Sequence, residues 1–207
     1  MIFYRSLRDL GRRPAQAAVV ATKKAPVRLT QTAEYADRLF KEKKFLAAEK
    51  AYLELIKVDH KNAQAYSRLG IIYSRLKNHG DAIECFQIAS QLAPSAGSFH
   101  NLGLIFYENK NYIKSIAAFE KSIMFEPSAE RYKSLARSYQ KLANWGKMAA
   151  TLEKAVEIHV SKDTLGLLAN AYMASGARQK ALEVYKRILE LDPNDAKAKR
   201  AAGVVQT

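Results

Sequence analysis

A pattern that recurs about every 33 residues is the feature of this chain that most restricts its fold. In its clearest copy, Gly70 is followed by Tyr73 and, after a polar stretch, by Phe86 and Pro94. Gly103 begins the same pattern again, 33 residues after Gly70. A repeat of this length predicts stacked pairs of helices rather than one globular core. Such an array offers surfaces for binding and not a catalytic pocket.

Each copy of the pattern is expected to fold as two helices. Leu69, Gly70 and Tyr73 recur at the spacing of one helical face. A polar break such as residues 77–81 separates the two helices, and a proline such as Pro94 ends the pair. A small residue, Gly or Ala, is expected where the two helices cross, because a larger side chain would hold the backbones apart.

The pattern resembles the tetratricopeptide repeat family, whose motif joins an aromatic residue, Leu-Gly, a second aromatic residue, an Ala-x-x-x-aromatic step and a closing proline. His60 and Val160 replace that proline in the first and fourth copies. The resemblance implies an all-α fold, a right-handed α-solenoid of five tetratricopeptide-like helix pairs with a C-terminal capping helix. The predicted order is a basic, flexible segment at 1–28, repeats at 29–62, 63–95, 96–128, 129–161 and 162–195, and the capping helix at 196–207.

Charge is unevenly distributed along the chain. The formal net charge is +14, and residues 1–28 hold seven basic residues against Asp9 alone. The repeats themselves carry only about +5. The single cysteine, Cys85, excludes an internal disulfide and suits a reducing compartment, so we predict a cytoplasmic location.

The basic N-terminal segment is open to three interpretations. It could be a disordered tail, a membrane contact through residues 1–13, or an organelle transit peptide, which its scarcity of Ser disfavours. Phe3, Leu7 and Leu10 share one side of a helical wheel, with arginines on the other. No apolar run approaches the roughly 18 residues of a membrane span. Membrane association and organelle import therefore stand as alternatives to a purely cytoplasmic protein.

The first helices of successive pairs are expected to line the concave face of the solenoid. Side chains offset from the Leu-Gly packing positions should point into this groove. Basic residues form a majority in the middle of the groove, with Leu104 and Tyr107 between them, so an extended peptide with acidic and apolar side chains would fit. Ordinary solvated helix faces are the alternative interpretation. The candidate groove residues are Arg68, Arg75, His100, Asn101, Leu104, Tyr107, Lys133, Arg137, Lys141 and Asn170.

One specialised use of the family can be tested at its own positions. Members that bind chaperones clamp a carboxyl terminus with Lys, Asn and Arg side chains on consecutive first helices. At the matching positions this chain has Ala33, Asp37, Arg68, Gly97 and Asn101. Only Asn101 is of a suitable type, and it lies in the wrong repeat. The comparison with the family therefore implies no chaperone carboxylate clamp.

The sequence contains no catalytic constellation and predicts no cofactor or metal. Its four histidines, His60, His79, His100 and His159, form no metal-spaced pair, and phosphate-binding glycine loops are absent. We predict a non-enzymatic scaffold that binds a peptide segment of a partner protein. The alternatives are a membrane-associated assembly factor tethered by the N-terminal segment, and nucleic-acid binding. The pI near 9.8 permits the latter, but the aromatic residues occupy packing positions and offer no stacking platform.

Overall fold

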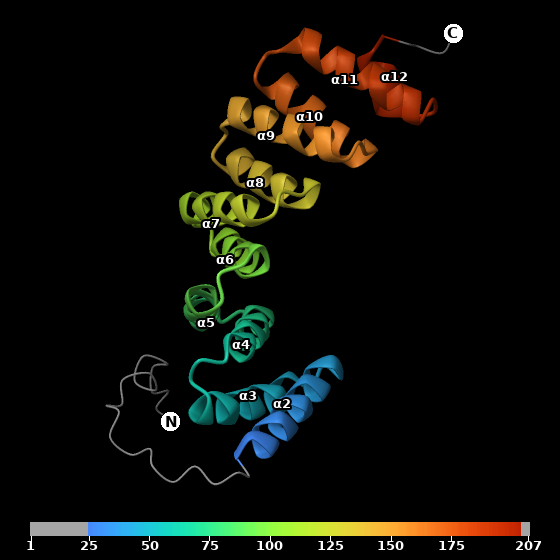
Figure 1. Cartoon of the computed structure of the whole chain (residues 1–207). Helices are drawn as coiled ribbons and strands as arrows, with labels where there is room; N and C mark the ends of the chain where they lie inside the picture. Colours follow the sequence, from blue (N-terminus) through green and yellow to red (C-terminus); the bar gives the residue numbers. More distant parts are fainter. Residues whose placement is uncertain (1–24, 204–207) are drawn as a thin grey trace. The chain divides into compact units, whose positions relative to one another are not determined.

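The computed structural model describes residues 25–203, and the side chains of residues 31–203. Within that range the chain forms helices joined by short turns, without a strand, so the predicted all-α solenoid fold of helix pairs is confirmed (Figure 1). Residues 1–24 of the N-terminal segment predicted at 1–28, to which the three interpretations apply, and the last residues of the expected capping helix lie outside the described residues, whereas residues 25–28 belong to a helix. The chain divides into two compact units, unit 1 at residues 1–105 and unit 2 at residues 106–207.

Unit 1 is built from two helical hairpins. Contacts within each hairpin and between α3 and α4 hold it together. A further helix, α6, carries the chain across the boundary between the units. These helices are α2 (Ala25–Lys41), α3 (Phe45–Val58), α4 (Ala63–Arg75), α5 (His79–Leu92) and α6 (Ala96–Glu108).

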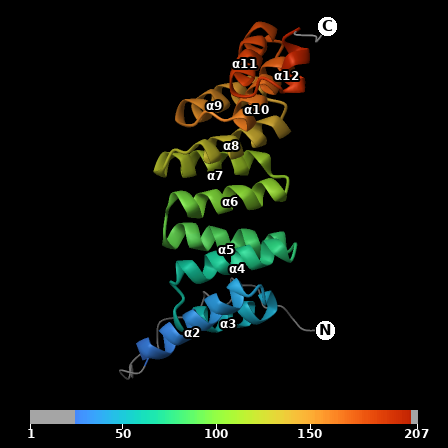
Figure 2. The same cartoon turned by 90° about the vertical axis from the view of Figure 1, so that its right-hand side faces the viewer.

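Unit 2 continues the alternation of first and second helices. Each helix from α7 to α12 packs on the next one in chain order (Figure 2). The last helix has only six residues, but it buries Ala198 completely in the core of the unit. The helices are α7 (Tyr112–Phe125), α8 (Ala129–Lys141), α9 (Trp145–Ile158), α10 (Lys162–Ala174), α11 (Arg178–Leu191) and α12 (Ala196–Ala201).

Polar caps at repeating positions begin most of the helices. Asn78, Asn111 and Asn144, spaced 33 residues apart, each accept a hydrogen bond from a backbone N–H in the first turn of a second helix. Ser128 and Ser161 do the same for α8 and α10. A cap accepts a hydrogen bond from one of the N–H groups that the start of a helix leaves unpaired. It therefore defines the residue at which the helix begins.

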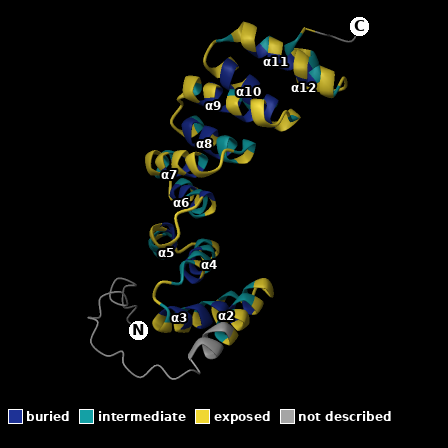
Figure 3. Ribbon diagram, viewed as in Figure 1, coloured by how far each residue is buried: buried dark blue, intermediate teal, exposed yellow. Residues whose placement is uncertain are grey.

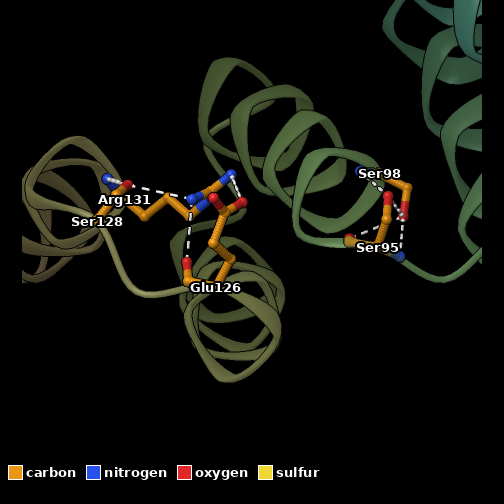
Figure 4. A network of polar contacts seen from close by, with 5 residues as sticks. All are labelled: Ser95, Ser98, Glu126, Ser128 and Arg131. Carbon is orange, nitrogen blue, oxygen red and sulfur yellow. Dashed lines mark hydrogen bonds and ion pairs between the residues drawn. The ribbon is translucent and has the colours of Figure 1, made fainter.

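The loop between α7 and α8 is held by a side chain as well as by its cap. Arg131 donates to the Glu126 carbonyl oxygen at 3.0 Å and to the Ser128 hydroxyl at 3.2 Å, and it pairs with the Glu126 carboxylate at 2.9 Å (Figure 4). In unit 1, Ser95 and Ser98 exchange hydrogen bonds across the start of α6, from Ser98 N–H at 3.1 Å and from Ser95 N–H at 2.9 Å. Local bonds of this kind fix where one repeat ends and the next begins.

Small residues on the first helices let the second helices pack closely. A Cβ added to Gly70 would lie 2.8 Å from the ring of Phe86 on α5. The obstacle is therefore the aromatic ring of the second helix and not the backbone, which corrects our expectation. Ala136 and Ala169 occupy the corresponding positions of α8 and α10 and are almost completely buried. Figure 3 shows the buried residues concentrated where helices face one another.

Two serines of unit 2 occupy positions where other repeats carry apolar residues. Ser115 on α7 and Ser138 on α8 are fully buried, and their hydroxyl oxygens lie 2.9 Å apart. A buried hydroxyl needs a hydrogen-bond partner, so each serine makes the other acceptable in the core.

The turn inside each helix pair contains one residue in the left-handed region. These residues are spaced 33 or 34 positions apart and are Lys43, Lys77, Lys110, Ala143 and Gly176, with φ between 52° and 80°. Only the last is a glycine, the residue that adopts this conformation without steric cost. The other four turns therefore carry local strain that the packing of the flanking helices sustains.

Gly70→Ala should destabilise the protein by about 1–3 kcal/mol, because the added methyl group overlaps the buried Phe86 ring. Gly166→Ala is the matched control, since a Cβ at this helical glycine meets no heavy atom within 4 Å. It should gain about 0.5–1 kcal/mol from the better helix propensity of Ala. Urea denaturation followed by circular dichroism measures both changes. Equal effects of the two substitutions would contradict the assigned helix crossing.

Lys77→Gly should stabilise the protein by up to about 1 kcal/mol, because it removes the cost of a left-handed lysine. Lys50→Gly, at an exposed site in the middle of α3, should instead cost about 1 kcal/mol. Both variants replace Lys by Gly, at Lys77 in the left-handed conformation and at Lys50 in a right-handed helix. A loss of stability in both variants would show that the turn is not strained at Lys77.

Candidate functional site

The outward surface of α8 and α10, which we call the A face of unit 2, carries four of the predicted groove residues. Lys133 joins the two helices, because its ammonium group lies 3.1 Å from Asp163 and 2.5 Å from Glu130. Its side chain is only 11% exposed. Hydrogen bonds to Glu130 and then to Asp163 raise the pKa of Lys133. Lys133 is therefore engaged within the protein and does not offer an unpaired charge to a ligand.

Asn170 is also occupied on this face. Its side-chain oxygen accepts a hydrogen bond of 2.6 Å from Lys197 on α12. Lys162 binds Asp192 and Asp195 at 2.7 and 3.0 Å and so ties the start of α10 to the turn before α12. These contacts position the last helices of unit 2, and they leave Asn170 as a supporting residue of the A face.

Arg137 and Lys141 differ from their neighbours on α8. Both side chains are exposed, and in the described part of the chain neither forms an ion pair. They are four residues apart, so they lie on one side of the helix, and Arg137 is four residues beyond Lys133. The A face therefore presents two unpaired cations next to an internal ion pair.

In unit 1 the predicted residues are likewise divided. Arg68 on α4 lies 3.4 Å from the carboxylate of Asp37, and its guanidinium group lies 4.7 Å from the ring centroid of Phe40. Asp37 also accepts hydrogen bonds from Tyr52 and Gln64. Arg68 therefore joins α4 to α2.

The remaining predicted residues are more accessible or lie on α6. Arg75 is exposed, with its guanidinium group 5.7 Å from the Phe45 ring. Leu104 is 41% exposed, His100 and Asn101 are half-buried, and Tyr107 packs edge-on against Tyr112 at 5.5 Å. Because α6 crosses the boundary between the units, its residues His100, Asn101, Leu104 and Tyr107 are assigned to no single face.

Unit 2 also contains two hollows that the sequence analysis did not predict. Each is lined by two successive second helices and the first helix between them. In the first hollow Tyr139 donates a hydrogen bond of 3.0 Å to Glu120, and Lys147 lies 5.7 Å from the Tyr139 ring. The same arrangement recurs 33 residues later in Glu153, Tyr172 and Lys180. The recurrence of these residues at the repeat period was the signal in the sequence.

These hollows differ in their surroundings even though their central residues repeat. Ile123, Leu135 and the 83%-exposed Met124 line the first one together with Lys154. In the second, Glu157 replaces Met124 and Glu183 replaces Ala150. The repeated Tyr–Glu bond joins one repeat to the next, so we assign it a structural role.

The described residues offer few groups for metal binding or nucleophilic chemistry. From residue 31 onward, no cluster of three or more His, Cys, Asp or Glu side chains could hold a metal ion. Cys85 is fully buried, and burial raises the pKa of its thiol far above the ordinary value. None of the helices described is both long enough and apolar enough to cross a membrane.

Comparisons with known proteins identify the repeats. Residues 63–95, 96–128 and 163–195 each match a model of the tetratricopeptide repeat. A crystal structure of MamA protein superposes with a TM-score of 0.74 at 24% identity, over 82% of this chain and 94% of that chain. MamA from Desulfovibrio magneticus RS-1, from residue 41 onward, gives 0.71 at 16% identity, over 81% and 97%.

A third structure is YrrB, described as a TPR protein with an unusual peptide-binding site. It gives a TM-score of 0.71 at 16% identity, over 83% of this chain and 90% of that chain. At these identities the similarity establishes the fold alone. No curated protein matches the chain in sequence.

The raised pKa of Tyr139 leads us to expect that the free energy of unfolding falls in alkaline solution. Burial, reinforced by the hydrogen bond to Glu120, raises the pKa of Tyr139 to about 12. An unfolded tyrosine loses its proton near pH 10. Between about pH 10 and 12 the unfolded chain therefore releases a proton that folded Tyr139 retains, and the free energy of unfolding falls as pH rises. Below about pH 10 this contribution is complete.

Tyr139→Phe should make the alkaline fall in unfolding free energy smaller than in the wild type. Urea denaturation at a series of pH values measures this fall, and tyrosinate absorbance reports ionisation. An unchanged dependence on pH would show that Tyr139 titrates alike in the folded and unfolded chains.

Proposed function

Because this chain belongs to the tetratricopeptide repeat family, we propose that it is a non-enzymatic scaffold which binds an acidic peptide segment of a partner protein on the A face of unit 2. The unpaired, exposed cations Arg137 and Lys141 carry this proposal. Cations that the fold itself requires are neutralised by nearby carboxylates, as Lys133 is. A pair without such carboxylates is complementary to acidic groups on a ligand.

An open position on α10 suits the backbone of an extended chain. Gly166 on α10 lies 33 residues after Lys133, and a Cβ built on it meets no heavy atom within 4 Å. Asp163, which binds Lys133, is three residues before Gly166. Asp163 and Gly166 therefore lie on the same side of α10, the side that belongs to the A face. The absence of a side chain at this point lets a peptide backbone approach the helix closely.

The chemistry of the face favours acidic and apolar side chains in the ligand. An arginine guanidinium group can form two parallel hydrogen bonds with one carboxylate. Met173, near the end of α10, is 47% exposed and offers a flexible apolar surface. An acidic peptide with an apolar residue beside its carboxylates would use both contacts. The similarity to YrrB supports peptide binding as a use of this fold.

The internal ion pair and hydrogen bond of the A face hold its helices in place in this proposal. Lys133 holds α8 against α10, and Lys197 holds α12 against α10 through Asn170. They keep the helices that carry Arg137 and Met173 in fixed positions, so the binding surface exists before the ligand arrives. Preorganisation of this kind lowers the entropic cost of binding.

Arg137→Glu combined with Lys141→Glu should abolish capture of the partner in pull-downs from native extract, with the melting temperature nearly unchanged. The control is Arg178→Glu combined with Lys186→Glu on α11, which changes the net charge equally at other exposed positions. A protein captured by the wild type and by the control, but not by the A-face variant, would support the proposal. Equal capture by all three would contradict it.

A second variant tests the same surface without changing its charge. Gly166→Leu fills the open space on α10, where a side chain meets no neighbouring atom, so folding should be preserved. Capture of the same partner should fall at least about tenfold if its backbone passes over Gly166. Unchanged capture by a folded Gly166→Leu variant would place the ligand elsewhere.

A further inference from the structure

The two turns inside the helix pairs of unit 1 form a basic surface that the proposed function does not use. We call it the turn edge: residues 41–46, where α2 passes into α3, and residues 75–78, where α4 passes into α5. The guanidinium group of Arg75 lies 5.7 Å from the ring of Phe45, which places the two turns side by side. The cations of the turn edge, all exposed, are Lys41, Lys43, Lys44, Arg75 and Lys77.

Carboxylates compensate these cations only in part. Glu42 pairs with Lys44 at 2.8 Å, and Asp81, in the first turn of α5, accepts a hydrogen bond of 2.6 Å from Asn78. The other three lysines and Arg75 form no ion pair in the described part of the chain. The turn edge therefore keeps an excess of positive charge.

The turns at the opposite end of these helices carry no such excess. In the turn between α3 and α4, Lys61 follows Asp59, and nearby Lys57 pairs with Glu54 at 2.6 Å. The α5–α6 turn, residues 93–95, carries no charge. Among the turns of unit 1, those of the turn edge therefore carry the excess of positive charge.

Exposed leucines accompany the cations. Leu46 is 67% exposed at the start of α3, and Leu76 is 44% exposed at the end of α4. The backbone beside them is held in a defined shape, with Lys43 and Lys77 in the left-handed region and Phe40 packed edge-on against Phe45 at 6.0 Å. Leu46 and Leu76 are therefore exposed on turns of defined backbone conformation, next to lysine side chains.

We propose that the turn edge of unit 1 binds the surface of an anionic lipid bilayer, with Leu46 and Leu76 entering the interface and the surrounding cations contacting lipid phosphate and carboxylate groups. Basic residues are attracted by the negative potential of such a surface, and neighbouring apolar side chains gain by leaving water. A single-stranded nucleic acid fits less well, because it binds by stacking bases on exposed aromatic rings. Phe45 of the turn edge and the neighbouring Phe40 each have a guanidinium group over the ring, from Arg75 and Arg68.

The turn edge contains no residue of the basic N-terminal segment, since it begins at residue 41, at the C-terminal end of α2. Charge reversal at the turn edge therefore leaves unchanged every residue that a tether through residues 1–13 would use.

The test is flotation of the full-length chain with phosphatidylcholine vesicles, with and without phosphatidylserine. We expect the wild type to float only with vesicles that contain phosphatidylserine. Lys43→Glu combined with Lys77→Glu should lower the partition coefficient about tenfold or more. Lys57→Glu combined with Lys61→Glu, the matched control at the opposite end, changes the net charge equally and should float like the wild type. Circular dichroism verifies that each variant is folded.

A third variant distinguishes lipid from other polyanions. Leu46→Ala keeps every charge and should weaken flotation several-fold at raised salt, where the apolar contact carries more of the binding. The proposal is overturned if the wild type does not float, if both charge variants float equally, or if Leu46→Ala floats like the wild type at raised salt. It is also overturned if the turn-edge variant loses binding to RNA or DNA while its flotation is unchanged.

Discussion

The contact on which the rest of the structure depends is the close packing of a small residue on one helix against a large side chain on the next. At Gly70 there is no space for even one methyl group beside Phe86. Where the small residue is Ala136 instead, Leu152 occupies the position of the ring. In these two helix pairs a small residue on the first helix faces a large side chain on the second. The stability of the array is a sum of such local contacts and of the contacts between neighbouring repeats.

Polar contacts then join neighbouring helices on this common framework. The buried Ser115–Ser138 pair joins α7 to α8, and the Tyr139–Glu120 bond joins the same helices nearer the surface. Lys133 and Arg68 use their charges in the same manner, each across two elements of its own unit. A basic side chain on a first helix is therefore as often a part of the scaffold as a part of a binding surface.

The charges that remain unpaired suggest two surfaces with different partners. On unit 2, the proposed binding surface combines Arg137 and Lys141 of α8 with the open position at Gly166 of α10 and suits a narrow, extended ligand. On unit 1, the cations of the turn edge accompany Leu46 and Leu76 and suit a broad anionic surface. Together, the two proposals describe a protein that brings a peptide-bearing partner to a membrane.

The sequence by itself determined the helices and their pairing, because the 33-residue period, the helical spacing of apolar residues and the small residue at each crossing are local features. It also identified the candidate groove residues, but it could not separate Lys133 and Arg68 from Arg137 and Lys141. Lys133 has one local partner, Glu130, three residues before it. The carboxylates that bind Lys133 and Arg68 from another helix, Asp163 and Asp37, are about 30 residues away in the chain. Only the tertiary structure decided which cations are neutralised across helices, since such an ion pair depends on a distance of a few ångströms between side chains that no local pattern specifies.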